Sequence, residues 1–407
     1  MYPNQPLFIG REVNVLVKTE DPKNLFSCSP GICRCPNGRL IATYGLRSPL
    51  QKIEDGSEIN FNTGYIAISD DHGESWKQVA KYPFRHARPF MAGDTLYILG
   101  HEKDLMVMRS DDLGETWSET FKLTEGEKWH QAPCNVWYAH GCVYLVMEQL
   151  RYKMQLWPPN AMAPVLMRAP VDADLTKTES WTFADAPAFR DVIDVDKLTY
   201  LGMPPLAIPD STDFDPKTHI NAPLGWLETN VVQVMDDKHW WYDPSGKTFH
   251  LFMRFHSGGT DYAAMLKVVE QGEEPGTGAM LTSFQQHPSG ADIVFLPMPG
   301  GHLKFHMLYD EKTKLYWLLS SQARDHFLAW DRNSLVLYFS KNLTAWCFAG
   351  VVALGETDKV TRSYASMVID GDDLQILSRS GSKDAKSAHD GDMVTFHRVE
   401  NFRDLVY

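Results

Sequence analysis

The chain has 407 residues, of which 43% are hydrophobic, and it carries a formal net charge of −13 at pH 7. This acidic balance argues against nucleic acid as a partner, although a local group of arginines can still attract a small anion. No apolar stretch approaches the roughly eighteen residues of a membrane span, and the first residues lack the basic and apolar regions of a signal peptide. We therefore expect a cytoplasmic protein, unless a leader has been removed.

The predicted elements repeat along the chain as two apolar strands joined by a turn with Gly, Asp or Asn. Six such hairpins occur in chain order, at residues 29–44, 88–99, 132–147, 228–253, 304–319 and 364–377. Each is followed by a third apolar run, at residues 65–68, 105–108, 164–167, 262–268, 335–339 and 393–397. The early run 13–18 has no hairpin of its own. We expect it to supply the missing outer strand of the last unit, because such a closure removes exposed sheet edges.

An eight-residue motif follows two of these third strands. Residues 69–76 read Ser-Asp-Asp-His-Gly-Glu-Ser-Trp, and residues 110–117 read Ser-Asp-Asp-Leu-Gly-Glu-Thr-Trp. The carboxylates can accept backbone N–H groups, the Gly supplies a positive φ, and the Trp is expected to pack back under the turn. Residues 340–346 look like a third copy that has lost its Gly and one position. The two full copies begin forty-one residues apart, at residues 69 and 110, and a repeat of this period is typical of propeller blades.

The motif resembles the Asp box, or BNR repeat, of sialidases and their relatives, which are six-bladed β-propellers. The resemblance implies an all-β fold, a single sialidase-type propeller over residues 1–407, closed by the N-terminal strand. In that family the box lies on the outer rim, away from the substrate. It therefore indicates the fold, and the function has to come from other residues.

One segment, residues 172–226, fits none of the predicted blades and is rich in Pro, Asp and Thr. A connection of this length in a compact domain is usually functional or disordered. We interpret it as an insertion that covers the pocket.

The candidate site follows from propeller geometry, because the starts of the innermost strands converge on the axis. Titratable or polar residues occupy these starts, namely Cys28, Ser29, Arg85, His86, Arg88, His130, Glu228, His302, Lys304, Arg362 and Tyr364. We expect Arg88, His302 and Lys304 to line the pocket. Each candidate residue also has a purely structural interpretation, such as a core tyrosine or an ion-pair partner.

The resemblance assigns roles to five positions. Tyr364, in Ser-Tyr-Ala-Ser-Met, is similar to the sialidase nucleophile, and Glu228 to the glutamate that activates it. Arg254 and Arg332 match the arginines that hold the substrate carboxylate. The acid/base aspartate of the family lies in the loop before the first box, where this chain offers Asp55.

The chain departs from the sialidase pattern at the first inner strand. The family has Arg-Ile-Pro there, and this sequence has Cys28-Ser29-Pro30, so the first arginine of a triad is missing. Arg34 or Arg47 could replace it. His130 and the pair His389-Asp390 are also unlike the family, so the substrate need not be sialic acid.

The sequence leaves three functions open. The first is a glycoside hydrolase that removes an acidic sugar from a glycan end, with exo-alpha-sialidase the nearest named activity. The second is a polysaccharide lyase on a uronate-containing glycan, with His130 or Tyr364 abstracting the C5 proton and an arginine neutralising the carboxylate. The third is a non-catalytic glycan-binding propeller, in which the inner-strand residues would not converge.

The six cysteines lack zinc-type spacing, and no motif implies a cofactor or a metal. The sugar, the linkage and the oligomeric state are not indicated.

Overall fold

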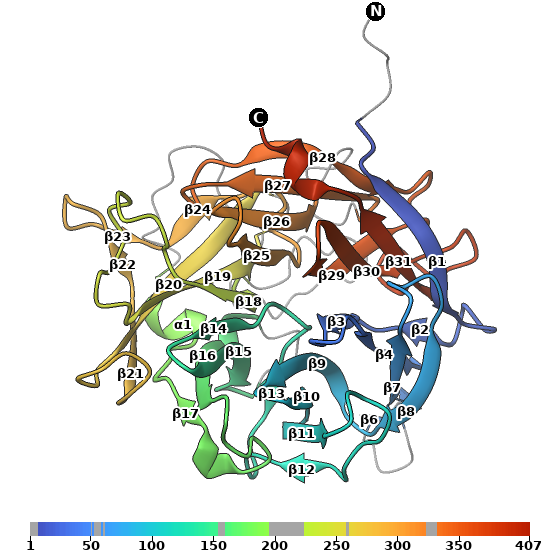
Figure 1. Cartoon of the computed structure of the whole chain (residues 1–407), viewed down its shortest axis with the longest axis horizontal. Coiled ribbons are helices and arrows are strands. Elements are labelled where there is room, and N and C mark those ends of the chain that lie inside the picture. The colour runs from blue at the N-terminus through green and yellow to red at the C-terminus, as the bar shows by residue number, and fades with distance from the viewer. Residues whose placement is uncertain are drawn as a thin grey trace, which may run out of the picture.

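The computed structural model describes residues 7–49, 51–52, 58–59, 62–153, 159–194, 224–257, 260–322 and 332–407. Over these ranges it is almost entirely β, with six antiparallel sheets arranged around a central axis (Figure 1). The prediction of a six-bladed propeller is confirmed. Among the helices of these ranges, none is long and apolar enough to cross a membrane.

The first three blades are formed by consecutive stretches of chain, each running from the axis outward. Blade one contains β2 (Phe26–Ser27), β3 (Gly31–Arg34), β4 (Leu40–Arg47), β7 (Asn62–Ser69) and β8 (Lys77–Tyr82). Blade two contains β9 (Arg85–Ala92), β10 (Thr95–Glu102), β11 (Asp104–Ser110) and β12 (Phe121–Lys122). Blade three contains β13 (Trp129–His130), β14 (Trp137–Ala139), β15 (Cys142–Leu150), β16 (Met162–Pro170) and β17 (Thr182–Phe183).

The last three blades follow the same plan, with a supplementary strand in blade four. Blade four contains β18 (Trp226–Val232), β19 (Thr248–Phe255), β20 (Tyr262–Glu270), β21 (Met280–Ser283) and β24 (Phe295–Pro297). Blade five contains β25 (His306–Asp310), β26 (Leu315–Ser321), β27 (Ser334–Ser340) and β28 (Cys347–Leu354). Blade six contains β29 (Arg362–Asp370), β30 (Asp373–Ser380), β31 (Met393–Val399) and β1 (Gly10–Lys18).

Short two-stranded ribbons and short helical pieces lie outside the blade strands. Two small ribbons pair β5 (Gln51–Lys52) with β6 (Glu58–Ile59), and β22 (Gln285–Gln286) with β23 (Asp292–Ile293). Within the described ranges, the helical pieces are η1 (Pro159–Ala161), η2 (Thr178–Ser180), α1 (Phe189–Val192) and η4 (Phe402–Leu405).

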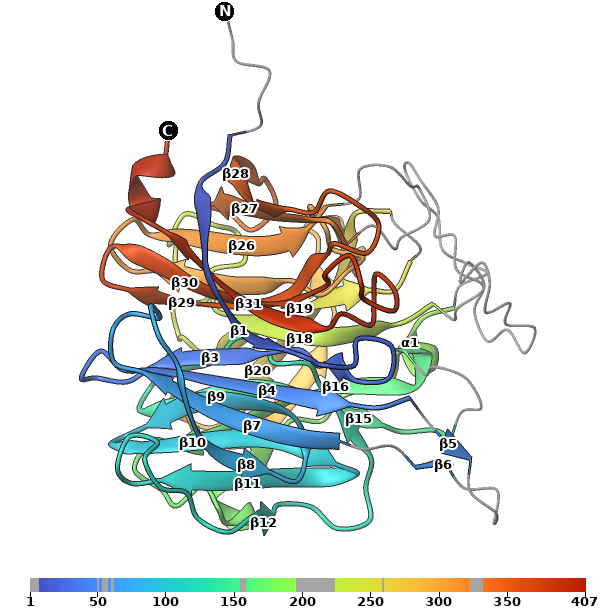
Figure 2. The same cartoon turned by 90° about the vertical axis from the view of Figure 1, so that its right-hand side faces the viewer.

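The ring is closed by the N-terminal strand, as predicted. β1 pairs antiparallel with β31, from Gly10 opposite Val399 to Lys18 opposite Met393. The first and last described strands therefore share blade six, where β1 covers β31 and is itself the outermost strand of the sheet (Figure 2).

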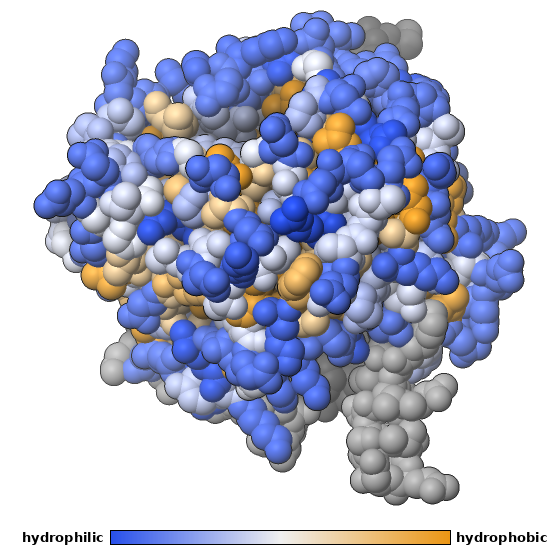
Figure 3. Space-filling view, turned by 60° about the horizontal axis from the view of Figure 1, so that its bottom comes forward, coloured by the Kyte–Doolittle hydropathy of each residue, from blue (hydrophilic) through white to orange (hydrophobic). Residues whose placement is uncertain are grey.

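The core lies between the blades, because each sheet packs one face against each neighbour. The middle strands are consequently buried on both faces, as in β16, where only the last of nine residues is exposed. One cluster joins blades one and six through Leu40, Ala67 and Phe396, and another joins blades two and three through Leu99 and Val143. The face seen in Figure 3 is mainly hydrophilic, with small separate apolar patches.

The two eight-residue turns form as the sequence predicts. In the first, Asp71 accepts from the Ser75 backbone N–H at 2.9 Å and from its hydroxyl at 2.6 Å, while Ser69 Oγ accepts from the Gly73 N–H at 2.8 Å. The second repeats these bonds with Asp112, Thr116 and Ser110. The glycines lie at φ of 88° and 93°, where a Cβ would be strained.

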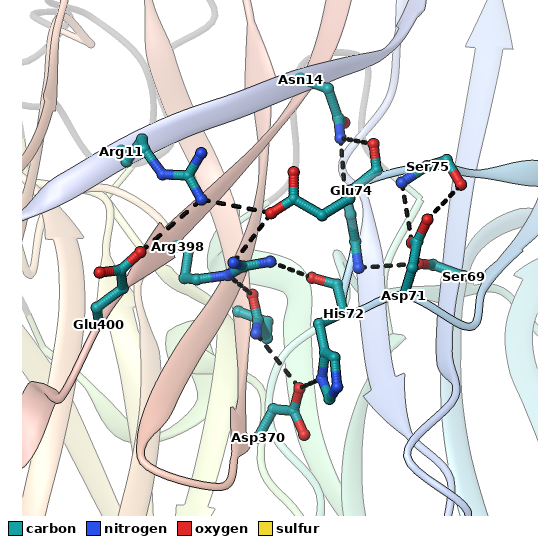
Figure 4. A network of polar contacts seen from close by, with 12 residues as sticks. Arg11, Asn14, Ser69, Asp71, His72, Glu74, Ser75, Asp370, Arg398 and Glu400 are labelled. Carbon is teal, nitrogen blue, oxygen red and sulfur yellow. Dashed lines mark hydrogen bonds and ion pairs between the residues drawn. The ribbon is translucent and has the colours of Figure 1, made fainter.

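Each turn also binds the preceding blade. Around the first turn, Arg398 of blade six donates to the carbonyl oxygen of His72 at 2.6 Å and lies 3.0 Å from Glu74 (Figure 4). His72 in turn contacts Asp370 at 2.6 Å. Around the second, Arg39 of blade one donates to the carbonyl oxygen of Leu113 at 3.1 Å. The turns therefore connect neighbouring blades as well as neighbouring strands.

The segment predicted to belong to no blade divides into two parts. Its beginning carries β17, which pairs with β16 at Met167 and Arg168, so this part completes blade three as its outer strand. The prediction is wrong there because the strand is only two residues long and gives no periodic signal. Residues 195–223, on which the predicted cover over the pocket depends, lie outside the described residues.

Candidate functional site

A cavity of about 370 Å³ lies at the axis, where the inner strands of several blades begin. Its lining comprises Cys28, Ser29, Arg47, Asn62, Arg85, His86, His101, His130, Ala132, Glu228, Tyr364, Arg379 and His389. The eight-residue turns lie at the other end of the blades, because three antiparallel strands separate each inner-strand start from the turn after the third strand.

Three residues of the lining have left-handed backbone conformations. His86, Glu228 and Tyr364 have φ values of 52°, 58° and 51°. Each lies in the innermost strand of its blade, at an irregularity in the pairing with the second strand. Such bulges redirect a side chain, and a non-glycine residue in this region costs about 1–3 kcal/mol. A bulge with a left-handed residue therefore occurs in the inner strands of blades two, four and six, and all three residues line one cavity.

Tyr364 lies at the centre of a group of cationic side chains. Arg254 Nη1 is 3.3 Å from the Tyr364 hydroxyl and 3.2 Å from Glu228 Oε2, so one nitrogen bridges the two groups. The guanidinium carbons of Arg332 and Arg379 lie 4.8 and 5.2 Å from the centre of the tyrosine ring. All five side chains are buried.

Burial and charge act in opposite directions on these arginines. Burial alone would lower the pKa of Arg254, but Glu228 and Tyr364 outweigh it and raise that pKa. For Arg332 and Arg379 burial dominates and lowers the pKa. A guanidinium nevertheless stays protonated near neutral pH. The wall around Tyr364 is therefore cationic and suited to an anionic group.

The pair His389 and Asp390 extends this wall. Asp390 accepts from Arg47 at 2.6 Å and lies 3.0 Å from His389 Nδ1. Burial, followed by the charge of Arg379, lowers the pKa of His389 to about 3, so its ring is neutral at pH 7. Although burial opposes it, the hydrogen bond from His389 keeps the pKa of Asp390 below its usual range.

A second group of lining residues consists of histidines. His86 Nδ1 and His101 Nε2 are 3.3 Å apart, and the His130 ring centre lies 5.6 and 5.5 Å from theirs. His130 Nδ1 is 3.9 Å from Glu148. Burial, and then the neighbouring histidines, lower the pKa of His86 and His101 well below the ordinary value. The described residues contain no group arranged to hold a metal ion.

The structure brings most of the predicted site residues together. Glu228 and Tyr364 both bond to Arg254, Arg332 lies against the Tyr364 ring, and His130, Arg47 and His389 line the same cavity as Glu228 and Tyr364. Asp55 lies outside the described residues.

Four predicted residues take other positions. Arg88 lines a second cavity farther along the axis. Lys304 donates to the carbonyl oxygen of Ala365, and His302 lies 2.9 Å from Asp261 while its carbonyl oxygen accepts from Arg254. Arg34, considered as a replacement for the missing arginine, pairs with Asp370 at 2.5 Å and lines the second cavity. An inner strand runs the whole depth of the ring, so only its first residues reach the first cavity.

Sequence reasoning missed Arg379 and His101. Both are the last but one residue of the second strand of a blade, as Arg254 is. The second strand ends where the inner strand begins, because the two are antiparallel. Charged or aromatic residues at the ends of second strands were therefore the signal that could have identified them.

Solved structures match the fold over nearly the whole of this chain, at low sequence identity. A protein of unknown function from Dyadobacter fermentans has a TM-score of 0.54 at 13% identity, with 96% of this chain and 99% of that chain covered. Trypanosoma rangeli sialidase in complex with sialic acid has a TM-score of 0.53 at 14% identity, with 100% and 60% covered. A GH93 alpha-L-arabinofuranosidase of Fusarium graminearum with arabinobiose has a TM-score of 0.50 at 11% identity, with 97% and 98% covered.

This likeness shows the six-bladed propeller fold shared with sialidases, and at these identities it shows the fold alone. The chain spans about 60% of the length of the Trypanosoma sialidase. No protein-family profile matches the sequence, and neither does any protein of curated function.

Proposed function

We propose that this protein is a glycoside hydrolase that removes an acidic sugar from the end of a glycan. One observation carries the proposal. The Tyr364 hydroxyl and the Glu228 carboxylate share one nitrogen of Arg254, and two further guanidinium groups lie against the tyrosine ring. A nucleophile, a base and a cationic wall thus meet at one buried point.

The chemistry of this group suits a retaining hydrolysis. The Tyr364 oxygen attacks the anomeric carbon and forms a C–O bond, while the bond to the leaving oxygen breaks. Glu228 accepts the phenol proton, and Asp55 is the candidate that protonates the leaving group. Water then cleaves the tyrosyl intermediate. A neutral phenol suits this role, because an anionic nucleophile would be repelled by the substrate carboxylate.

The cationic wall favours an acidic substrate over a neutral one. Arg332, Arg379 and Arg254 can donate to a carboxylate, and charge-assisted hydrogen bonds of this kind are the strong ones. In this proposal Arg379 takes the place of the arginine that is missing from the first inner strand. The nearest named activity is exo-alpha-sialidase, and the partner is a carbohydrate chain with an anionic terminal sugar.

The proposal is tested with Tyr364→Phe on a panel of aryl glycosides of acidic and neutral sugars. The variant removes one oxygen with almost no change in shape, so turnover should fall by orders of magnitude while ligand binding persists. Tyr338→Phe is the matched control, because the Tyr338 hydroxyl donates to Gln322 and neither residue lines the cavity. Full turnover by Tyr364→Phe would contradict the nucleophile, and hydrolysis of neutral sugars alone would contradict the role of the arginines.

The histidine group supports a second candidate, a polysaccharide lyase acting on a uronate. A base that abstracts the C5 proton has to be neutral before it acts, and the low pKa of His86 and His101 keeps both rings neutral at pH 7. A lyase would give an unsaturated product with new ultraviolet absorbance. Loss of that signal in His130→Ala but not in Tyr364→Phe would favour this reaction over hydrolysis.

A further inference from the structure

A second cavity, of about 520 Å³, lies on the same axis beyond the first. The two are lined by successive residues of the same inner strands. On β9, His86 lines the first cavity and Arg88 the second, and on β29, Tyr364 lines the first and Ser366 the second. The cavities are therefore stacked along the axis, with the second towards the end of the blades that carries the eight-residue turns.

The walls of the second cavity are mainly apolar. They include Ile32, Phe90, Val136, Leu308, Met367 and Ile369. Tyr138, which is 51% exposed, also lines it and marks the side that opens to solvent. A molecule entering from this side passes apolar side chains before it reaches the buried interior.

A buried guanidinium group lies at the inner end. Arg88 is 2% exposed, and its Nη2 donates to the carbonyl oxygen of Val146 at 3.1 Å. Within the described part of the chain, Nε and Nη1 of Arg88 have no hydrogen-bond partner, and no carboxylate forms an ion pair with it. Burying such a charge without a counter-charge is costly, so a ligand that supplies one is stabilised there.

Glu148 attracts Arg88 electrostatically, but no carboxylate of the described residues forms an ion pair with Arg88. Glu148 accepts from the backbone and hydroxyl of Thr229 at 3.1 and 2.8 Å, and Glu228 is bound to Arg254. Burial raises the pKa of Cys134 to about 12, so this neighbour stays a neutral thiol.

Two further basic groups lie close to the same point. Burial lowers the pKa of Lys304 to about 8, and the Lys304 amine donates to Ala365 and to the Ser366 hydroxyl. His306, which lines the cavity, has a pKa well below the ordinary value because of burial, and is neutral at pH 7. Arg88 and Lys304 therefore face one nearby carboxylate, Glu148, because Glu228 is already paired with Arg254.

We propose that this second cavity is a binding site for a monovalent anion, held by Nε and Nη1 of Arg88. The apolar walls favour a carboxylate with a short apolar tail, and a halide can occupy the inner end alone. The site is separate from the proposed catalytic cavity and does not depend on the reaction carried out there.

Thermal unfolding with added anions tests the site. Sodium chloride, formate, butyrate and octanoate are titrated at constant ionic strength, with sulfate as the balancing salt. A ligand that binds only the folded state stabilises it by RT ln(1 + [L]/Kd), so Tm rises once the ligand concentration exceeds Kd and continues to rise logarithmically. We expect such a rise for the wild-type protein, with a lower fitted Kd for butyrate or octanoate than for formate. In Arg88→Met the fitted Kd should increase at least tenfold, or the response should disappear.

Arg379→Met separates the two sites, because it removes a buried guanidinium from the first cavity. Any anion response that belongs to the first cavity should be lost in this variant, and the response that belongs to the second cavity should persist. If the response follows Arg379 and not Arg88, the inference is overturned while the proposed hydrolase stands. No anion response in the wild-type protein would mean that water alone fills the site, and would also overturn the inference. If Arg88→Met does not fold, wild-type crystals soaked in bromide provide the test through the anomalous signal of the ion. We expect a bromide peak beside Arg88. A peak in the first cavity alone would contradict the inference.

Discussion

The two ends of the blades satisfy their polar groups in different ways. At the turn end, the Asp71 carboxylate accepts from Ser69 and Ser75, and these three residues lie within one short turn. At the cavity end, Tyr364 contacts Arg254 and Arg332, which come from blades four and five. The hydrogen bonds of Asp71 are therefore complete within a few residues, whereas the cavity exists only once the ring has closed.

Left-handed backbone occurs at both ends. The first turn places Gly73 at φ of 88°, where the absence of a Cβ removes the strain, and His72 beside it at φ of 57°. The cavity places Glu228 and Tyr364 at φ of 58° and 51°. The two ends therefore differ in the burial of their charges: Asp71 of the turn is exposed, whereas Glu228 and Arg254 at the cavity end are buried.

The largest effect on stability should come from breaking the buried pair at the cavity end. Arg254→Met leaves the Glu228 carboxylate buried without its cationic partner, so the free energy of unfolding should fall by about 3–5 kcal/mol. Urea unfolding measures it. The double variant Arg254→Met with Glu228→Gln should recover much of the loss, because no uncompensated charge is left. Equal losses in the single and double variants would show that the arginine acts through packing.

A smaller effect should come from the aromatic residue of the first turn. The Trp76 ring packs against Phe396 of blade six, with 5.4 Å between ring centres, and it is only half-buried. Trp76→Ala should therefore cost about 2 kcal/mol, below the range for a fully buried aromatic, and lower Tm. Turnover per folded molecule should stay unchanged, as active-site titration can show. A normal Tm with lost activity would give the turn a functional role and remove the contrast between the two ends.

The fold could be predicted from the sequence because its signals are local. The six hairpins, the third strands and the motif at residues 69–76 each need fewer than about twenty residues of context, and strand alternation and glycine-containing turns reveal them. The closing strand β1 could also be predicted, since its apolar run had no partner nearby in sequence. The short strand β17 could not, because two residues give no period.

The site was predictable only in part. The starts of inner strands led to Glu228 and Tyr364, but the same rule nominated Arg88, which lies one bulge farther along β9 and reaches the other cavity. Arg379 and His101 were missed because they lie on second strands, and their place at the axis depends on pairing between strands. Left-handed conformations at Glu228 and Tyr364 have no sequence signal, since neither residue type favours them.

The smallest predicted effect concerns the charge of the first turn. Hydrogen bonds from the side chain and backbone of Ser75, and from Ser69, lower the pKa of Asp71 to about 2 from a usual value of 3.8. Because the folded-state pKa is the lower one, the stabilisation is fully present above about pH 4 and is lost as the pH falls towards 2. Asp71 is solvent-exposed, so screening reduces its contribution to about 1 kcal/mol.

Asp71→Asn should therefore lower the free energy of unfolding by about that amount at pH 7 and have little effect at pH 2, as urea unfolding at both pH values can test. Asp112 occupies the same place in the second turn, and its pKa is also about 2, so Asp112→Asn should behave alike. An equal loss at both pH values would mean that the side-chain geometry of Asp71, and not its charge, stabilises the turn.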